Sequence, residues 1–188
     1  MNNKQKCGWC VGDPLYEAYH DKEWGVPIYD DAILFEFLVL ETFQAGLSWI
    51  TILKKRENFR QAFNDFNYQK IATYKQDKIN SLLQDTGIIR NKLKVNATVT
   101  NAQAFMKIQA EFETFSKYIW QFINEKPIIN SVLNYKEAAP NTALSDTISK
   151  DLKKRGFKFV GSTVVYAYMQ AIGMVNDHEM SCFRYSEV

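Results

Sequence analysis

Apolar residues recur at the three- and four-residue spacing of an α-helix along almost the whole chain, and this periodicity restricts the possible folds more than any other feature. The alternation of apolar and polar positions that would predict strands is nearly absent. The chain has 188 residues, of which 46% are hydrophobic, enough to fill one sizeable core. We therefore expect an all-α fold with a single domain over residues 1–188, in one or two lobes.

Capping residues and turn formers divide this pattern into separate helices. Asp30 and Asp31 are candidate N-caps for the first clear helix, and Gly46 suits the turn after it. Residues 125–142 contain two prolines and several asparagines, which predict a loop. Helices are predicted over residues 32–43, 48–63, 78–85, 90–111, 114–124, 145–155 and 162–174.

Charge and hydropathy favour a soluble, cytoplasmic protein without a membrane span. Glu36 and Glu41 interrupt the longest apolar run, and residues 1–6 are polar. Residues 1–50 carry 3 basic and 8 acidic groups, whereas residues 51–188 carry 20 and 13. This asymmetry is typical of a protein with one side facing a polyanion, although charge runs are more often solvated helix faces.

Every cysteine and histidine lies in the first twenty or the last eleven residues. His178 and Cys182 are four residues apart, so one helical turn would direct both side chains toward one point. Cys7 or Cys10, together with His20, can supply further ligands from the other end of the chain. Two thiolates and two imidazoles suit a closed, structural Zn²⁺ site. Such a site would tie the two chain ends together.

Two alternatives to a metal site remain open for the cysteines. Cys7-Gly-Trp-Cys10 is a C-x-x-C motif of the kind that lowers a thiol pKa in redox proteins. Redox motifs of this type follow a strand, however, and no strand-like segment precedes Cys7. The other alternative is that the cysteines and histidines are ordinary buried residues.

Glu41 is a lone acid on the inward stripe of a helix that is apolar around most of its circumference. It follows Phe37 by four residues and Leu38 by three. Burial of a carboxylate without a partner is costly, so the position predicts either a salt bridge or a functional acid with a perturbed pKa. The functional interpretation places Glu41 at the floor of a pocket, where it accepts hydrogen bonds from a ligand.

Aromatic residues are concentrated near Glu41 in the sequence. Two of the four tryptophans, Trp9 and Trp24, lie in the first 24 residues. A third, Trp49, follows the helix that carries Glu41 after a short turn. Most aromatic side chains belong to cores, but Trp and Tyr faces also stack on flat, electron-poor rings. The candidates for such a binding pocket are Trp9, Tyr16, Tyr19, Trp24 and Trp49.

A glycine turn that opens a helix near the C-terminus is a candidate phosphate site. Lys158 precedes Gly161 and Ser162, where free backbone N–H groups and the helix dipole favour an anion. The segment resembles the second half of a helix–hairpin–helix, except that Phe159 stands where the first hairpin glycine usually lies. Two further basic patches are predicted, one at Lys54, Lys55, Arg56 and Arg60, the other at Arg90, Lys92 and Lys94.

Longer motifs resemble the 3-methyladenine DNA glycosylase I family. They occur in family order along essentially the whole chain, and several are compositionally unusual. The motifs are Cys7-Gly-Trp9, residues 13–27 (DPLYEAYHDKEWGVP), Glu41, residues 44–58 (QAGLSWITILKKREN), 87–92 (GIIRNK), 152–161 (LKKRGFKFVG) and 175–178 (VNDH).

The resemblance implies a helical DNA repair glycosylase of the helix–hairpin–helix superfamily. Such an enzyme flips N3-methyladenine out of double-stranded alkylated DNA, hydrolyses the N-glycosidic bond and releases free 3-methyladenine. It implies a structural zinc on Cys7, His20, His178 and Cys182, with Cys10 left over. It also assigns the base pocket to Glu41 and the five aromatic residues, and a duplex wedge to Gly46 and Leu47.

The catalytic chemistry that we expect is limited. A base methylated at N3 is cationic and leaves without protonation, so Glu41 is expected to select by charge and shape. No residue is assigned to support a developing sugar cation, and no lysine is assigned as a nucleophile, so lyase activity is not expected.

We expect a monomer. The alternative function from a different class is a damage-binding protein that uses the same pocket without turnover.

Overall fold

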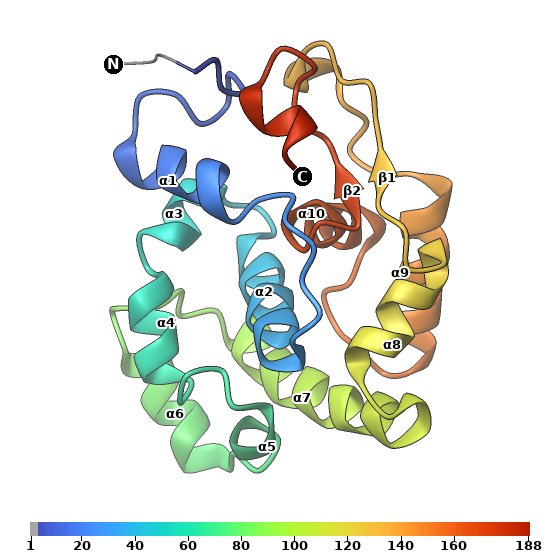
Figure 1. The fold of residues 1–188 in the computed structure, drawn as a ribbon. Coiled ribbons are helices and arrows are strands. Elements are labelled where there is room, and N and C mark those ends of the chain that lie inside the picture. Colours follow the sequence, from blue (N-terminus) through green and yellow to red (C-terminus); the bar gives the residue numbers. More distant parts are fainter. Residues whose placement is uncertain (1–3) are drawn as a thin grey trace.

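The computed structural model describes residues 4–188, and within them it confirms the helical fold (Figure 1). Residues 1–3, part of the polar N-terminus considered above, lie outside the described residues. The helices are α1 (Pro14–Lys22), α2 (Asp31–Gln44), α3 (Trp49–Leu53), α4 (Arg56–Ala62), α5 (Tyr68–Ile71), α6 (Gln76–Gln84), α7 (Lys92–Phe112), α8 (Phe115–Trp120), α9 (Ala143–Lys154) and α10 (Ser162–Ala171). Short 3₁₀ turns follow at η1 (Gln121–Ile123), η2 (Tyr135–Glu137) and η3 (Phe183–Ser186).

Helix α2 is the centre of the core. Every residue from Leu34 to Phe43 is buried, and α2 packs against α3, α7, α8 and α10. Asp30 caps the helix by accepting hydrogen bonds from the N–H groups of Ala32 and Ile33 at 2.9 and 3.0 Å. Asp31, the other candidate cap, instead accepts from the backbone of Phe115 and Ser116 and so holds the start of α8.

The structure differs from the sequence prediction in three parts of the N-terminal half, one of which is the unpredicted helix α5. The predicted helix over 48–63 is broken at Lys54 and Lys55 into α3 and α4, and the Lys55 ammonium there donates to the carbonyl oxygens of Thr86 and Gly87. Helix α1 was not predicted. Its signals are an Asp13 cap and a proline at the first helical position.

The prediction of a loop over residues 125–142 was incomplete. Strand β1 (Ile128–Ile129) pairs in parallel with β2 (Val175–Asn176), which brings the C-terminal segment beside this region (Figure 1). The helix predicted over 162–174 ends at Ala171 for a local reason. Gly173 adopts φ +75°, and a Cβ there would lie 2.4 Å from the backbone of Val26 and Pro27.

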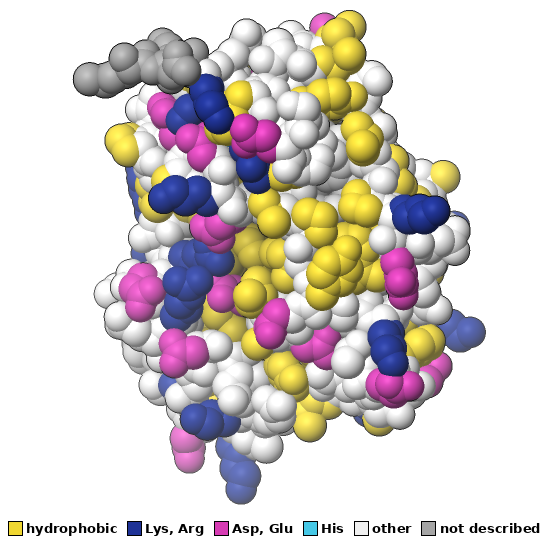
Figure 2. Space-filling view, in the orientation of Figure 1, with side chains coloured by type: hydrophobic (Ala, Val, Ile, Leu, Met, Phe, Trp, Pro, Cys, Tyr) yellow, Lys and Arg dark blue, Asp and Glu magenta, His cyan; other side chains and the backbone are white. Residues whose placement is uncertain are grey.

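The basic patch predicted at Lys54, Lys55, Arg56 and Arg60 does not form a free cationic surface. Lys54 pairs with Asp13, and the Arg56 guanidinium bridges Glu23 and Glu36 at 2.6 Å each. Basic and acidic side chains are interspersed on the face that Figure 2 presents. Lys94 was wrongly assigned to the surface, because it is only 6% exposed.

Among residues 4–188, no helix combines the length and the apolar character that crossing a membrane requires.

Candidate functional site

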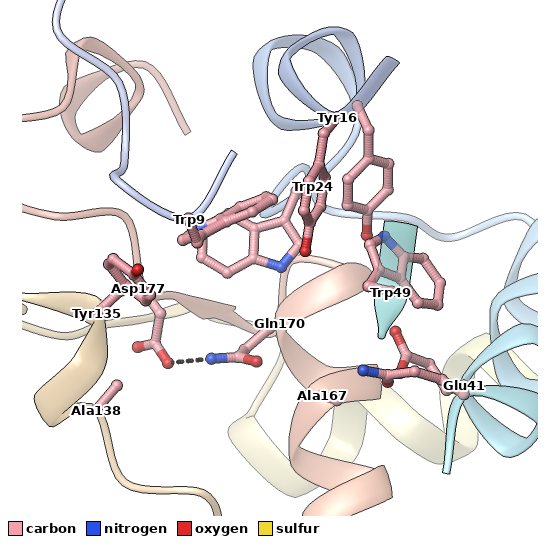
Figure 3. Close-up of a pocket in the computed structure, with 12 residues that line it drawn as sticks. Trp9, Tyr16, Trp24, Glu41, Trp49, Tyr135, Ala138, Ala167, Gln170 and Asp177 are labelled. Carbon is pink, nitrogen blue, oxygen red and sulfur yellow. Dashed lines mark hydrogen bonds between the residues drawn. The ribbon is translucent and has the colours of Figure 1, made fainter. Parts of the chain in front are cut away.

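One cavity of about 210 Å³ brings Glu41 and all five predicted aromatic residues together (Figure 3). Helix α1 supplies Tyr16 and Tyr19, α2 supplies Glu41, and α3 supplies Trp49. The remaining lining residues are Trp9, Trp24, Gln44, Tyr135, Ala138, Ala167, Gln170 and Asp177. Residues that are more than 150 positions apart in the sequence therefore share one site.

The aromatic rings that line the cavity form two packed groups, which together make an aromatic wall. The ring centroid of Trp9 lies 4.8 Å from that of Tyr16 and 5.0 Å from that of Trp24. The Tyr19 and Trp49 centroids are 5.4 Å apart. These separations are typical of tilted and edge-to-face aromatic packing, which fixes the ring orientations. In Figure 3 the rings of Trp9, Tyr16, Trp24 and Trp49 lie above Glu41 and Gln170. The cavity can accommodate a flat ring along this wall.

Glu41 lies at the floor of the cavity, where its buried carboxyl group has an oxygen atom free to bond to a ligand. Its side chain is 3% exposed, and its Oε2 atom has no hydrogen-bond partner among the described residues. Burial raises the pKa of the Glu41 carboxyl from its ordinary value of 4.5 to about 8. The indole Nε1 of Trp49 is also buried, and within the described part of the chain it has no hydrogen-bond partner. Such groups are rare in folded proteins and mark candidate ligand contacts.

The cavity also contains polar residues that sequence reasoning missed. Asp177 is 4% exposed, and its carboxylate accepts hydrogen bonds from Tyr166 Oη, Gln170 Nε2 and Asn130 Nδ2 at 2.6 to 2.7 Å. A carboxylate only accepts, so the Gln170 amide turns its nitrogen to Asp177 and its oxygen to the cavity (Figure 3). The only available signal was the position of Asp177 in the VNDH motif.

The Gly46 and Leu47 turn follows directly after the helix that carries Glu41. Gly46 has φ +81°, and Leu47 is 40% exposed, in agreement with the expected exposed turn. The Leu47 N–H donates to the Gln44 carbonyl at 2.6 Å, which closes the turn. Gln44 itself lines the cavity. The exposed apolar side chain of Leu47 therefore follows a cavity-lining residue by three positions, just after the end of α2.

The predicted phosphate site retains an open backbone. Gly161 is the N-cap of α10, and no atom lies within 4 Å of the position that a Cβ would take. The Ser162 hydroxyl is directed away to Ser145 Oγ at 2.8 Å, so the backbone N–H groups are the donors that remain. Lys158 is exposed. Phe159 adopts φ +57°, the left-handed conformation that the expected hairpin glycine would adopt without strain.

A second cluster lies where the chain ends meet. Cys7, His20, His178 and Cys182 are all buried, and one ligand atom from each lies within 4.8 Å of the others. His20 Nε2 is 3.2 Å from His178 Nδ1 and 3.4 Å from Cys182 Sγ, and His178 Nδ1 is 3.6 Å from Cys7 Sγ. A tetrahedral Zn²⁺ with ordinary bond lengths separates its ligand atoms by about 3.3 to 3.8 Å. The donor set therefore fits zinc.

The surroundings of this cluster orient its histidines. His20 Nδ1 lies 2.8 Å from Asp21 Oδ1, and His178 Nε2 lies 3.2 Å from the Trp24 carbonyl oxygen. These outward partners leave Nε2 of His20 and Nδ1 of His178 to face the centre of the cluster, as in metal-binding histidines. His178 and Cys182 do converge, but through a turn; the helical turn expected between them is absent.

Cys10 lies outside the four-residue cluster. Its thiol donates to the Cys7 carbonyl oxygen at 3.2 Å. Burial raises the pKa of Cys10 to about 12 and also raises that of Cys7. A redox dithiol requires a lowered thiol pKa, so this environment disfavours the redox alternative.

Comparison with known proteins identifies relatives of the whole chain. A family model described as methyladenine glycosylase matches residues 9–185. The DNA-3-methyladenine glycosylase 1 of Escherichia coli (strain K12) is 48% identical over 181 residues, which cover 96% of this chain and 97% of that protein.

Solved structures agree with this match. A crystal structure of 3-methyladenine DNA glycosylase I has a TM-score of 0.92 and 48% identity, covering 95% of this chain and 98% of that chain. A tyrosine-to-phenylalanine variant of 3-methyladenine DNA glycosylase I, solved in complex with 3-methyladenine, has a TM-score of 0.91, 37% identity and 97% coverage of both chains. The chain belongs to the methyladenine glycosylase family of enzymes. The resemblance found in the sequence is thereby confirmed.

Proposed function

We propose that this protein is a monofunctional DNA-3-methyladenine glycosylase. It flips N3-methyladenine out of double-stranded alkylated DNA and hydrolyses the N-glycosidic bond, releasing the free base and leaving an abasic site. The observation that carries the proposal is the buried, unpartnered carboxyl oxygen of Glu41 beneath an aromatic wall.

The aromatic wall supplies binding energy for the flipped base. Each stacked base contributes about 1 to 3 kcal/mol, and a cationic ring adds attraction to the electron-rich faces. The five aromatic side chains that line the cavity stack on or enclose the ring; they form two packed groups, one with Trp9, Tyr16 and Trp24 and one with Tyr19 and Trp49. This wall accepts any purine, so it does not by itself select the methylated one.

Selection for the methylated base is the role that we propose for Glu41. In the empty pocket the raised pKa of about 8 keeps the carboxyl protonated near neutral pH. A cationic base stabilises the carboxylate, which releases its proton and pairs with the ring. Ordinary adenine is neutral and offers no such compensation, so the Glu41 carboxyl beside it stays protonated and no ion pair forms.

Bond cleavage then requires little assistance. The N3-methylated base departs as a neutral leaving group, and its electron pair comes from the glycosidic bond. Water adds to the sugar carbon and loses a proton, which completes the hydrolysis. Asp177 is the other carboxylate on the wall, but three donors already occupy its oxygens. We therefore assign no residue to the sugar cation and expect no strand cleavage.

DNA contact in this proposal involves two elements outside the pocket. Leu47 wedges into the space that the flipped base leaves, with Gly46 permitting the close approach of backbone to DNA. Gly161 and Ser162, with Lys158, bind a backbone phosphate as half of a helix–hairpin–helix. The protein acts as a monomer and as a single domain.

We also propose that one structural Zn²⁺ occupies the cluster of Cys7, His20, His178 and Cys182. The metal supplies a crosslink between the chain ends and takes no part in the reaction. The crosslink matters for the pocket because Trp9 and Trp24 lie next to the cluster. The Trp24 ring centroid is 4.6 Å from that of His178, and the Trp9 centroid is 5.3 Å from that of His20.

The decisive experiment is a base-release assay on methylated duplex DNA with chromatographic identification of the liberated bases. We expect free 3-methyladenine from the wild type and a large loss of release with Glu41→Gln. A wild type that binds the damaged duplex but never releases base would instead support the alternative of a non-catalytic damage-binding protein.

A further inference from the structure

Helix α7 makes a buried contact with each of the two loops that are proposed to bind DNA. One contact is from Lys94 to the loop of residues 45–48, which carries Gly46 and Leu47. The other is from Asn101 to the hairpin of residues 155–161, which carries Lys158. Neither side chain lines the base pocket.

Lys94 holds the end of α2 and the start of the 45–48 loop. Its ammonium donates to the carbonyl oxygens of Phe43 and Ala45 at 2.8 and 2.6 Å. The last carbonyl groups of a helix have no helical partners and lie at the negative end of its dipole, so a cation there is stabilising. A buried lysine is costly in itself, and burial lowers the pKa of Lys94. The hydrogen bonds of the Lys94 ammonium therefore fix the start of the 45–48 loop relative to α7.

The side-chain amide of Asn101 holds the hairpin by bonding to both backbone polar groups of Lys158. Its Nδ2 donates to the Lys158 carbonyl oxygen at 3.0 Å, and the Lys158 N–H donates to Asn101 Oδ1 at 2.7 Å. Asn101 is fully buried, whereas Lys158 is exposed. The next residue, Phe159, has φ +57°, so the amide also fixes the point at which the backbone turns.

The two contacts lie on the same side of one rigid helix. Lys94 and Asn101 are seven residues apart, which is close to two helical turns and a rise of about 10.5 Å. On the outward side, α7 lines an open groove together with the hairpin. The groove residues are Leu93, Asn96, Ala97, Thr100, Lys158 and Phe159. The surface where α7 meets the hairpin is thus accessible to a large ligand.

We propose that α7 is a spacer that sets the separation of the 45–48 loop and the hairpin, with Lys94 and Asn101 as positioning residues for DNA engagement. The inference rests on the proposed function, because it takes both loops to contact one duplex. Two elements held at a fixed separation bind one ligand with a high effective concentration. Release of either element from the spacer removes that advantage.

The test compares Lys94→Met, Asn101→Leu and the double variant with the wild type. Fluorescence anisotropy measures affinity for a duplex with an abasic-site analogue, and tryptophan quenching measures affinity for free 3-methyladenine. Thr98→Val is the matched control, because Thr98 is buried on the same helix and its hydroxyl bonds only to the Lys94 backbone oxygen.

We expect each single variant to lose duplex affinity by about tenfold and the double variant to lose little more, because either loss already uncouples the loops. Affinity for the free base should stay within about twofold of the wild type in all of them, and Thr98→Val should match the wild type in both assays. If Lys94→Met does not fold, Asn101→Leu must show the same separation between duplex and free-base affinity.

Three results would overturn the proposal. The first is unchanged duplex affinity in the single variants. The second is a parallel loss of free-base affinity, which indicates general damage to the fold. The third is strictly additive losses in the double variant, which indicate two independent contacts. Failure of the proposed function has a different signature, in which the wild type binds the abasic duplex but releases no 3-methyladenine from methylated DNA.

Discussion

Replacement of Glu41 by glutamine should stabilise the folded protein while it impairs the proposed function. The folded-state pKa of about 8 exceeds the ordinary value of 4.5, so between these values the folded protein holds a proton that the unfolded chain has released. Stability therefore falls as pH rises through this window. Glutamine is neutral at every pH and has nearly the same shape, so it avoids this loss.

The size of the effect follows from the width of the window. Each pKa unit corresponds to 1.36 kcal/mol, and pH 7 lies about 2.5 units above the ordinary pKa, so Glu41→Gln should gain about 3 kcal/mol at pH 7. The gain should shrink to below about 1 kcal/mol at pH 5 and level off near about 5 kcal/mol above pH 8.

Urea unfolding followed by circular dichroism, with saturating zinc at each pH, measures this difference. Glu57→Gln is the control, because the Glu57 side chain is 70% exposed and the same substitution there replaces no buried carboxyl. A Glu41→Gln gain that is equal at pH 5 and pH 8, or absent at both, would refute the argument that burial of the carboxyl raises its pKa.

Three further predictions follow from other parts of the structure. The kcat/KM for excision by the wild type should rise about tenfold per pH unit below pH 8 and then level off, because Glu41 in the empty pocket must lose its proton to pair with the cationic base. The low residual kcat/KM of Glu41→Gln should lack this slope. Purified protein should contain one zinc per chain by mass spectrometry, and Cys182→Ala should lose the metal and melt at least about 5 °C lower, whereas Cys10→Ala should keep it. Asp31→Ala should cost about 1 to 2 kcal/mol in urea unfolding by removing the hydrogen bonds that Asp31 accepts from the first two backbone N–H groups of α8, with base release unchanged because Asp31 is not a pocket residue.

Apolar periodicity and capping residues predicted most of the helices, because both are properties of short segments of sequence. It failed where tertiary contacts override local preference. Residues 48–63 read as one helix, yet Lys55 reaches across to Thr86 and Gly87 at the break. The pairing of β1 with β2 involves only two residues on each strand and has no periodic signal to detect.

Long-range contacts also decided which polar side chains are buried and bonded within the protein. Lys94 reads as a surface lysine, but it satisfies the carbonyl groups at the end of α2 from a buried position. Gln170 and Asp177 could not be recognised from their spacing, because their alignment depends on how α10 packs beside the C-terminal segment. Spacing alone does not distinguish Cys7 from Cys10. The family resemblance assigned Cys7, and in the folded chain it is Cys7 that lies with the histidines.

The sequence by itself determined the helical class, the membership in the methyladenine glycosylase family and the presence of an acid on an apolar helix stripe, because these depend on residue type and spacing. The tertiary structure alone decided that Glu41 Oε2 lies at the bottom of an aromatic cavity with no hydrogen-bond partner among residues 4–188. The physical reason is that the cost of a buried charge depends on every neighbour around it, and those neighbours come from segments that the sequence places far apart.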